Sequence, residues 1–129
     1  MGAQKFSISE KLNSQIAPLK VVLEAKNFPT IQAGIAGALE RAKAGSDDLL
    51  GPNLLLATEI ASRARALLAN YLSFSKEQQK WASVGILYFI KQGDLTHDET
   101  PITGFDDDAL VMNHVLEKIG LKNLYIEIS

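Results

Sequence analysis

The stretch SKEQQKWASVGILYFI, residues 75–90, decides the fold because it predicts a buried helix with a marked beginning. Ser75 and Gln78 have the spacing of a capping box, in which each side chain bonds the other residue's backbone N–H. Beyond Trp81 the stretch is apolar nearly all round, which is typical of a helix in the interior of a bundle. The apolar run is far shorter than the ~20 residues that a membrane-spanning helix needs. We therefore predict a core helix and no transmembrane segment.

Apolar residues also recur every three or four positions in four further stretches, and each stretch predicts an amphipathic helix. Pro18 lies inside the first of them and predicts a kink or a division into two short pieces. Phe28-Pro29 predicts the end of that helix, because the residue before a proline is disfavoured in helical geometry. Thr30 and Asn53 are candidate caps of the next two helices. The predicted helices cover residues 12–23, 30–42, 54–72, 75–90 and 109–119.

The predicted fold is therefore all-α, a compact bundle of five helices in which residues 1–129 form a single domain. Gly120 is suited to end the last helix, because glycine tolerates the left-handed backbone angles found there. In the tail that follows, Leu124, Ile126 and Ile128 alternate with polar residues. A lone strand needs a partner, so we expect a short extended tail that packs back on the bundle as coil rather than one paired with another subunit.

Composition excludes several classes of function. The net charge is −2 and the 13 basic residues are scattered, so the sequence predicts no nucleic-acid surface. The absence of cysteine excludes disulfides, thiolate nucleophiles and cysteine-ligated metal sites. The first residues, MGAQKFSISEKL, lack the apolar core of a signal peptide. Together these features predict a cytoplasmic protein.

An acidic connection, residues 94–108, joins the last two predicted helices and contains six Asp or Glu residues. It lies within the pattern YFI-xxx-DL-xx-D-xx-P-xx-G-xx-DDALV, which covers about residues 81–115 with its flanks. The matching positions are Tyr88, Phe89, Ile90, Asp94, Leu95, Asp98, Pro101, Gly104, Asp107, Asp108, Ala109, Leu110 and Val111.

This pattern closely resembles the signature of the YkvA-like family of bacterial proteins, a domain of unknown function. The resemblance implies a compact helical fold and brings no established activity. Glu99-Thr100 stands where the family usually has apolar residues, so the connection in this chain is expected to be more polar.

The aspartates of this connection allow two interpretations. In the first they are structural, because carboxylates accept backbone N–H bonds at turns and at helix N-termini. In the second, Asp94, Asp98, Asp107 and Asp108 converge on a divalent cation such as Mg²⁺, Ca²⁺ or Mn²⁺, which prefers oxygen ligands. Their spacing is not that of an EF-hand.

The sequence contains no catalytic motif such as GxSxG, a P-loop or HExxH. His97 in the acidic connection and His114 on the last helix are the two histidines. Trp81, Tyr88 and Phe89 have helical spacing and are expected in the core rather than at a ligand platform. We therefore expect a non-catalytic protein without a cofactor, which acts through a protein partner or by self-association. The alternative is a cation-dependent enzyme or sensor built on the four aspartates.

Overall fold

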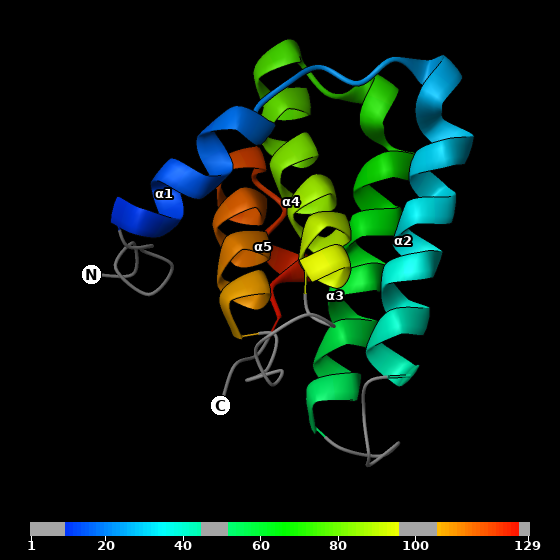
Figure 1. The fold of residues 1–129 in the computed structure, drawn as a ribbon. Helices are drawn as coiled ribbons and strands as arrows, with labels where there is room; N and C mark the ends of the chain where they lie inside the picture. The colour runs from blue at the N-terminus through cyan, green and yellow to red at the C-terminus, as the bar shows by residue number, and fades with distance from the viewer. Residues whose placement is uncertain (1–9, 45–51, 96–105, 127–129) are drawn as a thin grey trace.

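Helix α4 (Lys76–Leu95) lies at the centre of the computed structural model and packs against helices α2, α3 and α5 (Figure 1). The predicted capping box begins it. The N–H of Ser75 donates to Gln78 Oε1 at 2.9 Å, and the N–H of Gln78 donates to Ser75 Oγ at 3.2 Å. The helix runs five residues beyond the predicted end at Ile90. Residues 82–86 are all buried, which confirms an interior helix.

The structure describes residues 10–44, 52–95 and 106–126. These residues form five α-helices and four short 3-10 helices and contain no strand, so the predicted all-α bundle is confirmed. None of the described helices is long and apolar enough to cross a bilayer. The other elements are α1 (Glu10–Ile16), η2 (Ala17–Leu19), η3 (Ala25–Asn27), α2 (Phe28–Ala44), α3 (Pro52–Ala69), η4 (Tyr71–Ser73), α5 (Asp106–Ile119) and η5 (Lys122–Leu124).

Prolines mark the beginning of two helices where the sequence prediction placed boundaries differently. Pro29 lies in the first turn of α2, and Pro52 begins α3. The predicted caps Thr30 and Asn53 are thus inside their helices, and Phe28 begins a helix rather than ending one. The reason is that a proline in the first turn sacrifices no helical hydrogen bond, since the N–H groups there have no partner in any case.

The first predicted helix is instead divided. Helix α1 ends at Ile16, and Pro18 lies in the following 3-10 turn. The chain then crosses one end of the bundle, through residues 20–24 without regular helical structure, to reach α2 (Figure 1). Leu19 and Leu23 still pack against the core, so the apolar spacing identified the right residues but the wrong backbone beyond Pro18.

The apolar residues of the predicted helix 30–42 that recur every three or four positions, Ile31, Ile35, Leu39 and Ala42, are all buried, so the inner face that this spacing predicts is confirmed. Gly34 allows α4 to approach closely at this interface. A Cβ atom on Gly34 would lie 3.1 Å from Ile90 Cδ1, tighter than an ordinary van der Waals contact. Gly34 therefore allows close packing between α2 and α4.

A buried hydroxyl of Tyr71 fixes the segment that crosses the end of the bundle. Tyr71 is fully buried, and its hydroxyl accepts a hydrogen bond from the N–H of Leu23 at 2.8 Å. The same hydroxyl lies 2.8 Å from Ser83 Oγ, which donates to the carbonyl of Gln79 at 3.0 Å. With Ser83 donating to Gln79, Tyr71 is the donor to Ser83. A continuous hydrogen-bonded chain thus runs from Leu23 into α4.

The variant Tyr71→Phe tests this anchor. It leaves the Leu23 N–H without its acceptor, so we expect the free energy of unfolding to fall by about 1–3 kcal/mol. Urea denaturation of Tyr71→Phe, Ser83→Ala and the double variant measures the coupling. Both hydroxyls belong to the same chain of hydrogen bonds. The double variant should therefore lose less free energy of unfolding than the sum of the losses in the two single variants. Strict additivity would contradict the proposed network.

The C-terminal end of α5 has the predicted glycine stop. Gly120 has a φ of 99°, and the N–H groups of Gly120 and Leu121 donate to the carbonyl of Leu116 at 2.8 and 2.9 Å. Gln78 Nε2 donates to the carbonyl of Ile119 at 3.1 Å, so a side chain of α4 also closes this end of α5.

After this stop the chain packs back on the bundle as predicted, but Lys122–Leu124 form the 3-10 helix η5 rather than an extended coil. Residues 127–129 lie outside the described part. Asn113 is fully buried on α5 and holds the tail by two bonds to the backbone of Ile126, donating to its carbonyl at 2.8 Å and accepting from its N–H at 2.7 Å. Arg63 Nε donates to the Leu124 carbonyl at 2.8 Å. Partial burial raises the pKa of the Tyr125 phenol, and the Glu117 carboxylate raises it further.

The variant Asn113→Ala should destabilise the protein by about 2 kcal/mol or more, because it leaves two buried backbone groups of Ile126 without their bonds. Asn123→Ala is the matched control, since Asn123 is exposed on the same tail. Urea midpoints of the two variants provide the measurement. Equal urea midpoints for Asn113→Ala and Asn123→Ala would show that attachment of the tail through Asn113 contributes nothing to the stability of the bundle.

Candidate functional site

The acidic connection is only partly within the described residues. Asp94 falls in the last turn of α4, and Asp107 falls in the first turn of α5. Asp98, Pro101 and Gly104 lie outside the described residues, as does His97. Among the described residues no group of three or more His, Asp or Glu side chains is placed to hold a metal ion. The four-aspartate cation site therefore stays a prediction.

The beginning of α5 places three of the aspartates in one helical turn. The helix begins at Asp106, so Asp106, Asp107 and Asp108 all lie in its first turn. Asp108 is buried, with 2% of its surface exposed. Negative charge is favourable at this end of a helix, where backbone N–H groups carry the positive end of the dipole.

The variant Asp107→Asn separates the two interpretations. If the carboxylate stabilises the helix N-terminus, the free energy of unfolding should fall by about 0.3–1 kcal/mol, with or without Mg²⁺, Mn²⁺ or Ca²⁺. Glu117→Gln in the last turn of α5 is the control, because loss of a negative charge at that end should not destabilise through the dipole. Thermal denaturation with each ion and with a chelator is the measurement. Stabilisation of the parent protein by an ion, lost in Asp107→Asn, would favour the cation site.

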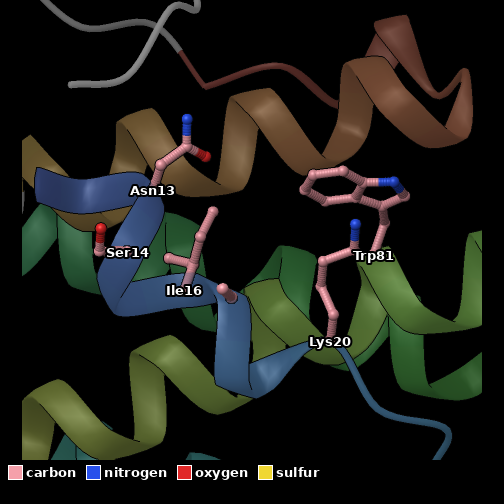
Figure 2. Close-up of a pocket in the computed structure, with 6 residues that line it drawn as sticks. Asn13, Ser14, Ile16, Lys20 and Trp81 are labelled. Atoms are coloured by element: carbon pink, nitrogen blue, oxygen red, sulfur yellow. The ribbon is translucent and has the colours of Figure 1, made fainter. Parts of the chain in front are cut away.

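A hollow beside Trp81 is a second candidate site, and it was not predicted. Tyr88 and Phe89 are buried in the core as expected, but Trp81 is only half-buried and contributes to a surface hollow of about 360 Å³. Figure 2 shows its indole ring and the Lys20 side chain beside each other at one end of the hollow, with Asn13 and Ile16 at the other. The residues that line this Trp81 hollow are Asn13, Ser14, Ile16, Ala17, Lys20 and Trp81.

Cationic groups gather at the Trp81 ring. Lys20 Nζ lies 4.3 Å from the ring centroid and Lys118 Nζ lies 5.6 Å from it, both within the range of a cation–π interaction. The His114 ring packs edge-on against the indole, with centroids 5.3 Å apart and an interplanar angle of 75°. Neither lysine forms an ion pair with a carboxylate of the described residues. The site therefore presents positive charge at an aromatic surface.

Three separate elements bring these groups together. Lys20 follows η2 and is positioned by the turn at Pro18 and by the anchor of Leu23 on Tyr71. His114 and Lys118 are four residues apart on α5 and therefore lie on one face of that helix. Trp81 enters from α4. The only signal in the sequence was the single tryptophan, because nothing local relates Lys20 to residues about sixty and a hundred positions later.

Chemically, the Trp81 hollow combines an apolar floor with polar and cationic groups. Ile16 is almost fully buried at 1% exposure, whereas Asn13 and Ser14 are exposed and offer an amide and a hydroxyl. An aromatic face, ammonium groups and an amide are groups that bind a ligand by packing and hydrogen bonds. No family model matches this chain, and no curated protein or solved structure is similar enough to count as a match. The resemblance to the YkvA-like family accordingly stays a prediction.

Proposed function

We propose that this chain is a non-catalytic binding protein that receives a partner protein at the Trp81 hollow, while its acidic connection serves as a structural junction. The observation that carries this proposal is the half-buried Trp81 with Lys20 Nζ 4.3 Å from its ring and a hollow of about 360 Å³ beside it. Tryptophan is enriched among the residues that dominate binding energy at protein interfaces.

The rigidity of the site also supports a binding role. Trp81 lies on the central helix, and the opposite wall is connected to the core through buried Ile16 and the Leu23–Tyr71 hydrogen bond. A surface that is held in place before binding loses little conformational entropy when a partner docks. The proposed site therefore has both the residue type and the support that a binding surface requires.

Capture experiments with matched variants test the proposal. The immobilised protein, incubated with a lysate of its source organism, should retain a partner that Trp81→Ala loses and that Trp81→Phe retains in part, because Phe keeps an aromatic ring. Leu72→Ala is the control, since Leu72 is a large exposed apolar residue elsewhere, with 69% of its surface exposed. Circular dichroism checks that each variant is folded.

Light scattering tests whether the partner at the Trp81 hollow is a second copy of the same protein. A parent dimer that Trp81→Ala converts to a monomer would identify self-association through the same hollow. Retention of every captured protein by Trp81→Ala, together with a parent monomer, would overturn the proposed function.

A further inference from the structure

We infer that the Trp81 hollow binds an acidic segment of a partner protein, with a Glu or Asp carboxylate of that segment bonded to the ammonium group of Lys20, while Lys118 adds positive charge at the same ring. This inference rests on the proposed function and names the chemistry of the partner. It is carried by the charge of the site, by its apolar floor and by the polar groups on its far side.

The lysines at Trp81 have no ion-pair partner in the described part of the chain, and they lie at an aromatic ring. Lys26 Nζ lies 3.3 Å from Glu24 and Lys43 Nζ lies 3.5 Å from Glu40, so each of these lysines is neutralised by a near neighbour in sequence. Lys20 and Lys118 have no such carboxylate among the described residues, yet they approach the same aromatic ring. Positive charge at an aromatic ring, without a paired carboxylate among the described residues, is complementary to an anionic partner.

The surroundings favour a carboxylate on a short apolar stem. The half-buried indole ring provides an apolar surface next to the Lys20 ammonium group. An ammonium–carboxylate bond is stronger in such partly dehydrated surroundings than in bulk water. The methylene groups of a Glu side chain can pack on the indole while its carboxylate reaches a lysine.

The far side of the hollow suits a peptide backbone. The Asn13 amide both donates and accepts hydrogen bonds, and the Ser14 hydroxyl does the same. Both side chains are exposed, so an extended segment is able to reach them without rearrangement of α1. Nucleic acid is a poorer fit, because two lysines do not form the row of cations that follows a phosphate backbone.

Trp81 is the single tryptophan of the chain, so its fluorescence reports directly on the site. A Glu-rich peptide without aromatic residues should shift or quench the emission to saturation, and added salt should weaken this binding. A peptide of the same length with every Glu replaced by Gln is the matched ligand and should bind at least tenfold more weakly. Sodium acetate at an equal carboxylate concentration tests whether a small anion suffices.

Lysine variants locate the contact. Lys20→Gln should weaken binding of the Glu-rich peptide by about three- to tenfold, the range of a partly exposed charge pair. Lys118→Gln should weaken it less, because Lys118 is at the Trp81 ring but is not one of the residues that line the hollow. Lys43→Gln is the control and should leave the affinity unchanged, because Lys43 lies on α2 and pairs with Glu40.

Each outcome of these binding measurements either supports or overturns the inference. Equal binding of the Glu and Gln peptides would overturn the acidic partner and leave the proposed binding function intact. An equal response to acetate would replace the peptide by a small carboxylate. Unchanged Trp81 emission with every ligand would overturn this inference, and it would overturn the proposed function only if capture by the parent protein also failed. Binding that is weakened in Lys20→Gln and Lys118→Gln but unchanged in Lys43→Gln would support the contact.

Discussion

The Tyr71 hydroxyl is the constraint on which the arrangement of the N-terminal third depends. Residues 20–24 cross the end of the bundle without helical hydrogen bonds, so their backbone groups need other partners. The buried hydroxyl supplies one by accepting a hydrogen bond from the N–H of Leu23, and it donates a hydrogen bond to Ser83 Oγ on α4. Phe28 packs edge-on against the Tyr71 ring, with the ring centroids 5.5 Å apart. The start of α2 is therefore held by the same side chain. One side chain thereby contacts both the segment that crosses the end of the bundle and the first residue of α2.

That constraint also determines the site. Lys20 lies three residues before Leu23, and its distance from Trp81 follows from the path that the Leu23–Tyr71 bond imposes. Helix α4, which carries Trp81 on the other side of the hollow, is held by its capping box and by the burial of residues 82–86. A binding surface placed between two supported elements keeps its geometry better than one formed by a loop. The stability of the bundle and the shape of the Trp81 hollow consequently depend on the same contacts.

The sequence predicted what periodicity and local chemistry control. The buried face of α2, the Ser75–Gln78 capping box and the Gly120 stop all follow from residues close to one another in the chain. The helix starts at Pro29 and Pro52 were misjudged, because a proline either ends or begins a helix and the sequence pattern does not distinguish the two. The failures at the ends of helices are therefore ambiguities of local signals.

The Trp81 hollow was not predicted from the sequence for a different reason. Trp81 has the spacing of a core residue, and its position beside Lys20 depends on the path of a segment about sixty residues earlier in the chain. The same holds for Asn113, whose buried amide has meaning only when Ile126 is placed against it. Periodicity identifies which face of a helix is buried, but it contains no information about which distant backbone reaches that face. Sites formed by contacts between distant segments thus require the structure.

Charge is distributed unevenly along α5, and this reconciles a chain of net charge −2 with a basic hollow. Three aspartates occupy its first turn, whereas Lys118 lies in its last turn, where the dipole favours a cation. The carbonyls of Leu116 and Ile119 at that end already accept bonds from Gly120, Leu121 and Gln78. Lys118 is therefore not required to cap these carbonyls, and its ammonium group remains at the Trp81 ring. A position that suits the helix dipole thus also places positive charge at the proposed binding surface.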